Sequence, residues 1–263
     1  MSRVAAAIQA AHDAGRGAFI GYLPAGFPDI ETSIEAALTL ARNGADIIEL
    51  GPPYSDPVMD GTVIQQATQQ VLANGFRTAD LFTVIKGITS QTDVPVVVMT
   101  YWNLVLQYGV DRYADDILAA GGAGLVTPDI TPEAAGEWIA ASERTGLDRI
   151  FLAAPTSTDE RLDLVISAST GFVYTVSTMG ITGERADLDR AARTLVDRIR
   201  SRGQVNACVG IGISTADQVS SVIEYADGAI VGTALVRVLR DSGLDALAET
   251  TRTLAGGTPT TRY

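Results

Sequence analysis

The stretch Asp46-Ile47-Ile48-Glu49-Leu50 is a short apolar run that ends in a turn rich in Gly and Pro. Seven more runs of this kind occur along the chain, and a helical pattern follows each of them. The runs are close to continuously apolar, as in strands of a parallel sheet that is covered on both faces. The eight runs are residues 18–22, 46–50, 94–99, 124–126, 149–152, 171–174, 207–210 and 228–232.

Eight strands that alternate with helices predict a single (β/α)8 TIM barrel, which belongs to the α/β class. No stretch of the sequence has the composition of a linker, and 263 residues suit one barrel, so we expect one domain over residues 1–263. An additional N-terminal helix is predicted over residues 2–14, with Val4, Ile8 and Ala11 at helical spacing. An open doubly wound sheet is the alternative architecture.

Several hydroxyl side chains stand where helices are expected to begin. Thr131 precedes Pro132, which suits the first helical position, and Ser157 with Glu160 has the spacing of a capping box. We therefore expect Thr78, Thr131, Ser157 and Ser214 to be N-caps. A last helix is predicted around Leu244, Leu247, Ala248 and Thr251.

The composition excludes several classes of function. Acidic residues number 31 against 19 basic ones, for a net charge of −12, so a nucleic-acid surface is not expected. No apolar run approaches the roughly 20 residues that span a membrane, and the N-terminus lacks the pattern of a signal peptide. We expect a soluble, cytoplasmic protein.

Lysine, histidine and cysteine each occur once, as Lys86, His12 and Cys208. This set is too small for a zinc cluster or a disulfide, so no metal site is expected. His12 falls in the N-terminal helix and Lys86 in an outer helix, away from the strand ends where barrels place catalysis. Cys208 is expected to be a small core residue. Catalysis must then depend on carboxylates, hydroxyls and backbone donors.

Two connections that follow strands are longer than a barrel needs, residues 51–62 and 177–189. Long loops in a compact domain are usually functional, and loops after barrel strands lie on the catalytic face. Glu49 lies at the end of its strand, where it either faces the barrel mouth or pairs with a buried Arg. Burial would raise its pKa and suit it to acid–base chemistry. Asp56 and Asp60 follow in the loop, although Asp beside Pro or Gly also serves ordinary turns.

The seventh and eighth strands end in Gly-rich turns, residues 209–214 and 231–234, which lead into helices. Backbone N–H groups at such helix starts bind phosphate, and barrels often place a phosphate site there. Glycine also serves plain turns, so one turn alone would be weak evidence. Thr182-Gly183, in the second long loop, is a third candidate contributor.

The stretch from Glu49 to Gly61, Glu-Leu-Gly-Pro-Pro-Tyr-Ser-Asp-Pro-Val-Met-Asp-Gly, closely resembles the signature of the tryptophan synthase α subunit family. The resemblance runs through the whole chain. It includes residues 21–28, 99–103, 127–129, 180–183, 210–214 and 232–234, and also Tyr174 with Ser177.

This resemblance implies a lyase of tryptophan biosynthesis with a (β/α)8 barrel. Its expected reaction is the cofactor-free retro-aldol cleavage of indole-3-glycerol phosphate to indole and glyceraldehyde 3-phosphate. By the same resemblance, Glu49 protonates indole C3 and takes the proton of the glycerol hydroxyl. Asp60 stabilises the indole N–H, so that two carboxyls in unlike environments divide the work.

The resemblance also assigns binding residues by position. The indole pocket is expected to contain Tyr22, Thr100, Tyr101, Asp129, Tyr174 and Ile211. The phosphate site is expected to contain Gly183, Gly212, Ile213, Gly232 and Thr233. Pro53, Asp56 and Thr182 match the loops that close over substrate and contact a β subunit. The implied assembly is an αββα heterotetramer, in which the β subunit carries pyridoxal phosphate and receives the indole.

Four positions depart from the family pattern. Met59 and Thr62 stand where a small residue and a proline are expected, Thr178 stands where many members have Arg, and Thr233 replaces a common Ser but keeps its hydroxyl. The reaction is expected to survive these changes, whereas loop closure and coupling to a β subunit are in question.

Two other functions remain open from sequence. A free-standing lyase would release indole without a partner, and a non-catalytic barrel would bind phosphate ligands only as an assembly partner. An isomerase or synthase with a similar phosphate site would share the fold, but the loop from Glu49 to Asp60 argues against it.

Overall fold

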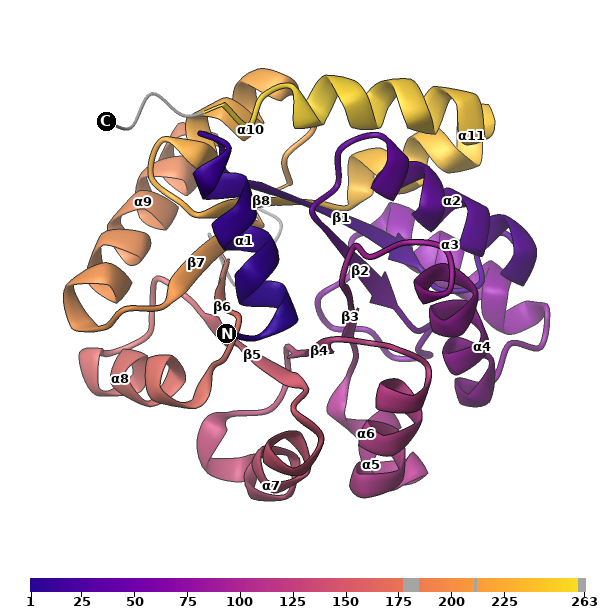
Figure 1. Ribbon diagram of the computed structural model, residues 1–263, viewed down its shortest axis with the longest axis horizontal. Helices are drawn as coiled ribbons and strands as arrows, with labels where there is room; N and C mark the ends of the chain where they lie inside the picture. Colours follow the sequence, from indigo (N-terminus) through magenta and orange to yellow (C-terminus); the bar gives the residue numbers. More distant parts are fainter. Residues whose placement is uncertain (177–184, 211, 260–263) are drawn as a thin grey trace.

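The computed structural model describes residues 1–176, 185–210 and 212–259. Its eight parallel strands form a closed barrel in the order β1 to β8 (Figure 1). This confirms the predicted TIM barrel and rules out the open doubly wound sheet. The strands are β1 Ala18–Pro24, β2 Ile47–Gly51, β3 Val96–Met99, β4 Gly124–Thr127, β5 Asp148–Ala153, β6 Phe172–Val176, β7 Asn206–Gly210 and β8 Gly228–Val231.

Helices surround the barrel, and two connections carry a pair of helices where the sequence predicted one. These pairs are α3 with α4 between β2 and β3, and α5 with α6 between β3 and β4. The helices are α1 Arg3–Asp13, α2 Ile30–Arg42, α3 Thr62–Ala73, α4 Thr78–Thr89, α5 Trp102–Tyr108, α6 Val110–Ala119, η1 Pro132–Ala134, α7 Gly136–Thr145, α8 Asp159–Ala168, α9 Arg185–Arg202, α10 Ala216–Ile223 and α11 Thr233–Ala255.

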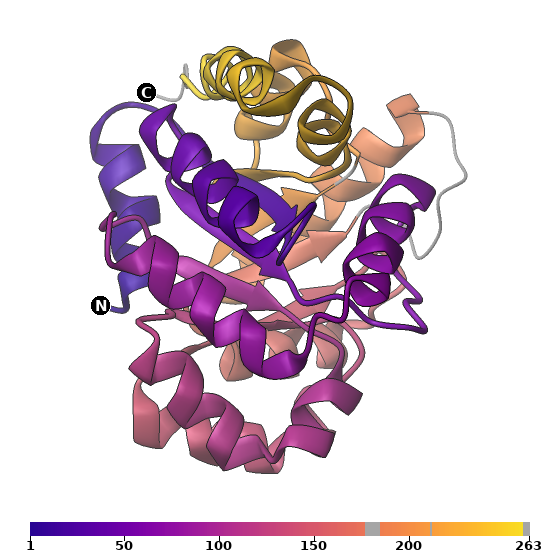
Figure 2. The ribbon, with the colours of Figure 1, turned by 90° about the vertical axis from the view of Figure 1, so that its right-hand side faces the viewer.

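Helix α1 closes the end of the barrel at which the strands begin, as Figures 1 and 2 show. Its buried residues Val4, Ile8 and Ala11 pack with the inward side chains of the strands, among them Ile20 and Ile47. This confirms the predicted N-terminal helix. The barrel interior is therefore apolar and sealed at its base, which leaves the C-terminal ends of the strands as the open face.

The predicted helix starts were wrong in detail. Thr158 caps α8 by accepting from the backbone N–H of Arg161, whereas the Ser157 hydroxyl accepts from Ala154 within the preceding loop. Thr215 caps α10 in a capping box with Gln218, in place of Ser214 with Asp217.

The prediction for Thr131 was right in position, since Thr131 is the N-cap residue and Pro132 begins the helix, whereas the prediction for Thr78 was wrong. Thr131 makes no capping bond within the part of the chain that the structure describes, and one turn of 3-10 helix follows it. Thr78 is the first residue of α4 rather than its cap, because the Asp80 carboxylate accepts from the backbone N–H of Arg77. At α8 and α10, the residue after the expected cap supplies the capping oxygen.

The three singly occurring residues lie where the sequence predicted. His12 lies in α1, Lys86 is exposed in the outer helix α4, and Cys208 is buried in β7. The second long connection was expected to reach residue 189, but α9 already begins at Arg185. Across the described ranges, no helix has the length and apolar character needed to cross a membrane.

Candidate active site

Glu49 faces the inside of the barrel near its open end. In β2 it stands two residues after Ile47, which packs in the barrel interior, and side chains two apart share a face of a strand. Its neighbours in register are Tyr22 of β1 and Val97 of β3. The side chain is 1% exposed, so the carboxyl lies below the barrel mouth.

The environment of Glu49 favours the protonated acid. Neither carboxyl oxygen has a hydrogen-bond partner among the described residues. Because no bond stabilises the charge, burial raises the pKa of Glu49 from 4.5 to about 8. The sequence also allowed a structural ion pair between Glu49 and a buried Arg. This alternative is wrong, because no Arg among the described residues is a partner of either Glu49 oxygen.

Asp60 lies in the loop after β2, and Tyr101 reaches it from the end of β3. The Tyr101 hydroxyl donates to Asp60 Oδ1 at 3.1 Å and accepts from the backbone N–H of Met59 at 2.9 Å. Burial raises the pKa of Asp60, and the bond from Tyr101 opposes that rise by favouring the carboxylate. The two acids therefore differ, because only Asp60 has a donor.

Tyr22 lies close to Asp60 and Glu49, and its ring also lies beside the turn after β8. Its pKa is raised well above the usual value, first by burial and then by the charges of Asp60 and Glu49. Its hydroxyl lies so close to Gly51 that a side chain at that position would overlap it. A Cβ at Gly232 would stand 3.1 Å from the Tyr22 ring, so both glycines make room for this tyrosine.

The structure brings Tyr174 toward Glu49 but does not bring Thr100 there. The charge of Glu49 contributes to the raised pKa of the buried Tyr174 phenol, after desolvation. Thr100 is buried and its side chain interacts with Tyr113 of the outer helix α6. Asp129 is exposed at the end of β4, where its carboxylate accepts from the backbone N–H of Trp102 at 2.8 Å.

Of the two Gly-rich turns, the one before α11 has its donors available. Helix α11 follows Gly232 with Thr233 as its first residue, and no described side chain caps it. By contrast, the Gln218 side chain accepts from the N–H groups of Ser214 (2.7 Å) and Thr215 (3.1 Å) before α10.

Nearer β7, the turn before α10 contains a glycine whose backbone conformation most other residues avoid. Gly212 has φ +68°, in the left-handed region that favours glycine, and Ile213 is buried. Anion binding here would therefore use the N–H groups around residues 212–213 together with the start of α11.

The loop after β2 exposes some of the predicted contact residues and buries another. Asp56 is exposed and accepts from the Ser55 hydroxyl at 2.5 Å, whereas Pro53 is buried within the chain itself. Val58 is 76% exposed, unusual for an apolar side chain of its size. Thr62 is the first residue of α3.

Five residues named from the sequence, Ser177, Thr178, Thr182, Gly183 and Ile211, lie outside the described residues. Sequence reasoning also missed some participants. Tyr54 stacks on Tyr101 with ring centroids 5.1 Å apart, and Asn103 donates to the Tyr54 hydroxyl at 3.2 Å. The signal was present, because Tyr54 stands between Glu49 and Asp60 and Asn103 follows Tyr101 closely.

A cavity of about 430 Å³ opens beside this site. Met59 and Asp129 line it on one side, and the segment of residues 154–158 lines it on the other, through Ala154, Thr156, Ser157 and Thr158. Leu152, which also faces the barrel interior, lies at its inner part. Elsewhere in the described ranges, no three His, Cys, Asp or Glu side chains are grouped to hold a metal ion.

Comparison with known protein families gives a full-length match. The family described as tryptophan synthase alpha chain matches residues 8–257. The tryptophan synthase alpha chain of Leifsonia xyli subsp. xyli is 62% identical over 257 residues, covering 98% of each chain. That of Mycobacterium avium is 51% identical over 256 residues, covering 97% of this chain and 94% of the other.

Solved structures agree with these relatives. A chain of Mycobacterium tuberculosis tryptophan synthase superimposes with a TM-score of 0.93 at 47% identity, and 98% of each chain is covered. A chain of the tryptophan synthase complex from Pyrococcus furiosus superimposes with a TM-score of 0.83 at 33% identity, covering 92% of this chain and 99% of the other.

Proposed function

The chain belongs to the tryptophan synthase alpha chain family, and we propose that Glu49 and Asp60 carry out its lyase reaction here. That reaction cleaves indole-3-glycerol phosphate to indole and glyceraldehyde 3-phosphate, a step of tryptophan biosynthesis. The observation that carries the assignment is the carboxyl of Glu49, which is dehydrated and unpartnered among the described residues at the open end of the barrel.

Glu49 is suited to supply a proton and to take one back. With a pKa of about 8 it is mostly protonated at neutral pH and can donate to indole C3. The bond between C3 and the glycerol carbon then breaks, and its electron pair moves into the protonated ring. The glycerol hydroxyl loses its proton to the Glu49 carboxylate and becomes the aldehyde, so the carboxyl ends as it began. The ring accepts the electrons, which is why the reaction needs no cofactor.

Asp60 is proposed to accept a hydrogen bond from the indole N–H. Protonation at C3 makes the ring nitrogen more positive, so a carboxylate beside it stabilises that intermediate. The Tyr101 hydroxyl holds Asp60 by one oxygen and favours its charged form. The Asp60 oxygen that Tyr101 does not occupy can face the substrate.

The remaining pocket residues are assigned because they lie near the two acids or because they match the family pattern. Tyr22, Tyr101 and Tyr174 supply aromatic walls around the two acids, consistent with a flat apolar ring as ligand. Asp129 and Ile211 keep their places in the proposed pocket by resemblance alone, whereas Thr100 is left out because its side chain interacts with Tyr113 of α6. The phosphate is proposed to bind at Gly212, Ile213, Gly232 and Thr233, with Gly183 joining from the second loop.

We also propose the partner and the setting. Structures of relatives are of tryptophan synthase and its complex, so a β subunit, which carries the pyridoxal phosphate, is the expected recipient of indole in an αββα assembly. The exposed Asp56 and Val58 give this chain a contact loop, with Pro53 shaping it and Thr182 in the second loop. Residues 1–263 are proposed to fold as one domain in the cytoplasm.

A turnover assay tests this function. Indole release from indole-3-glycerol phosphate is measured for the chain alone and with a tryptophan synthase β subunit. We expect slow release alone and a marked increase with the partner. No indole in either case would contradict the lyase, whereas a high rate that the partner leaves unchanged would contradict the assembly and favour a free-standing enzyme.

A further inference from the structure

The segment of residues 154–158, between β5 and α8, is the wall of the cavity that faces the loop of Asp60. It has no helix or strand of its own. Within it, the Ser157 backbone N–H donates to the Ala154 carbonyl at 2.9 Å, and the Ser157 hydroxyl accepts from the Ala154 N–H at 3.2 Å. These two bonds shape the turn but do not attach it to the rest of the protein.

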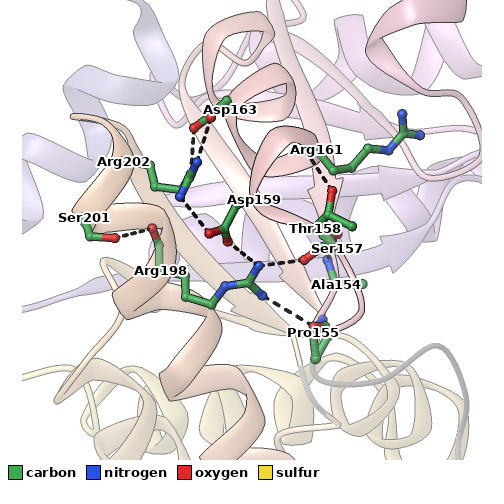
Figure 3. Close-up of polar contacts among 10 residues, drawn as sticks. All are labelled: Ala154, Pro155, Ser157, Thr158, Asp159, Arg161, Asp163, Arg198, Ser201 and Arg202. Atoms are coloured by element: carbon green, nitrogen blue, oxygen red, sulfur yellow. Dashed lines mark hydrogen bonds and ion pairs between the residues drawn. The ribbon is translucent and has the colours of Figure 1, made fainter.

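Arg198 of α9 makes that attachment (Figure 3). Its Nη2 donates to the Ser157 carbonyl at 2.7 Å and to Asp159 Oδ1 at 2.7 Å. Its Nη1 reaches the Pro155 carbonyl at 3.5 Å, a distance at which a hydrogen bond is weak. Among the described residues, no other side chain from outside the segment donates to its carbonyls.

We infer that Arg198 is a positioning residue that holds this wall of the cavity in place. The inference rests on the proposed function, because the cavity reaches the proposed indole pocket through Asp129, and Met59 beside Asp60 also lines it. Ala154 and Thr156 line the cavity, and they flank the carbonyls that Arg198 approaches. When the guanidinium is removed, the turn keeps its internal bonds but loses its attachment to α9.

Arg202 provides a matched comparison, one turn further along α9. It binds Asp163 with two bonds of 2.7 and 2.8 Å and contacts Asp159 Oδ2 at 3.0 Å. Both arginines are partly exposed and both pair with Asp159, as Figure 3 shows. Among the described residues, only Arg198 adds a bond to a carbonyl of the wall. Arg202 therefore shares the surface ion pairs of Arg198 and lacks its contact with the cavity wall.

Loosening a wall of this cavity, which Asp129 of the proposed pocket also lines and Glu49 does not, should weaken binding of the substrate and of the transition state to a similar extent. Such a change raises KM and leaves kcat nearly unaltered. A hydrogen bond to a charged donor is among the stronger ones in proteins. For Arg198→Ala we therefore expect KM for indole-3-glycerol phosphate to rise about five- to tenfold, with kcat within about twofold.

The experiment compares Arg198→Ala, Arg198→Lys, Arg202→Ala and Asp159→Asn in the full chain with its β subunit. Steady-state kinetics give KM and kcat, and hydrogen–deuterium exchange follows the backbone amides of residues 154–158. Arg198→Ala should raise KM and speed exchange in this segment. Arg198→Lys should recover part of both, because an ammonium can still donate to the Ser157 carbonyl.

Arg202→Ala and Asp159→Asn remove ion pairs but spare that carbonyl bond, so both should leave KM within about twofold. An unchanged KM in Arg198→Ala, or an equal rise in Arg202→Ala, would overturn the inference. Wild-type activity is the separate check on the proposed function, and the contrast in exchange between the two arginine variants can be read even if that function fails.

Discussion

Two buried carboxyl groups lie at opposite ends of the barrel, Glu49 near the C-terminal end of β2 and Asp148 at the start of β5. Their side chains are 1% and 2% exposed, and desolvation raises the pKa of both. At Asp148, the nearby Thr170 and Ser2 side chains and the Val4 backbone oppose the rise, and Oδ2 has no hydrogen-bond partner among the described residues. At Glu49 nothing in the described chain opposes it.

The two ends of the barrel therefore use a buried carboxyl differently. The base uses its carboxyl to attach α1, since Ser2 and Val4 belong to the start of that helix. At the mouth, neither oxygen of Glu49 has a hydrogen-bond partner in the part of the chain that the structure describes, which costs stability and keeps a proton available for chemistry. Functional groups in this fold lie at the mouth and structural ones at the base.

Glu49→Gln should produce the largest effect. The amide keeps the shape of the neutral acid but cannot exchange a proton, so kcat/KM for indole release should fall by about 10²- to 10⁴-fold. The assay is indole release with the β subunit present. A fall of less than about tenfold would show that Glu49 is not the proton-transfer group. Glu49 and Asp148 would then not differ in function as proposed.

The same variant should change how stability depends on pH. Folded protein keeps a proton on Glu49 that the unfolded chain releases above pH 4.5, so wild-type stability falls as pH rises from about 4.5 to about 8. Relative to wild type, Glu49→Gln should gain up to about 2.7 kcal/mol between pH 5 and pH 7, at 1.36 kcal/mol per pH unit. Urea unfolding at the two pH values measures it, and parallel curves for the two proteins would be the contrary result.

Asp148→Ala should show the reverse pattern. Loss of the interactions of this carboxyl with Ser2 and Thr170 should lower the free energy of unfolding by about 1–3 kcal/mol. Because Asp148 is at the base, kcat and KM should stay within about twofold of wild type. Chemical denaturation and the indole assay check the two halves. A large loss of activity in a folded Asp148→Ala protein would contradict the assignment of functional groups to the mouth and structural groups to the base.

Tyr101→Phe should have the smallest effect and sharpen the account of Asp60. The Tyr101 bond lowers the pKa of Asp60, so its removal should raise that pKa and shift the acid limb of the kcat/KM profile to higher pH. We expect about a fivefold loss at the acid end and less at neutral pH, since one hydrogen bond is removed.

Tyr54→Phe is the matched control for this variant, because it keeps the ring beside Tyr101 and loses only the bond from Asn103. Its acid limb should coincide with that of wild type. If both variants shift the profile equally, the hydrogen bond from Tyr101 is not what tunes Asp60.

The sequence was sufficient for the barrel and for its central acid. Near-continuous apolar runs identify buried parallel strands, and Glu49 stands two residues after an inward Ile47, so its direction follows from strand periodicity. The family pattern then placed Asp60 in the same site.

The sequence alone could not predict details that depend on contacts between residues far apart in the chain. The bond from Tyr101 to Asp60 joins residues 41 apart, and the bond from Arg198 to Ser157 joins residues 41 apart as well. The prediction of the cap of α8 failed for a related reason. Ser157 and Thr158 are both good N-cap residues, and the surrounding turn decides between them. The burial of Pro53 likewise depends on packing that no local pattern encodes.

The Glu49 carboxyl should hold its proton at neutral pH, because it is buried and unpartnered among the described residues. Infrared difference spectroscopy of wild type against Glu49→Gln measures this directly, through the C=O band of the protonated acid across a pH titration. We expect a band that is present at pH 7, lost with a midpoint of about 8, and retained in Asp148→Ala. A band already lost near the ordinary value of 4.5 would contradict it.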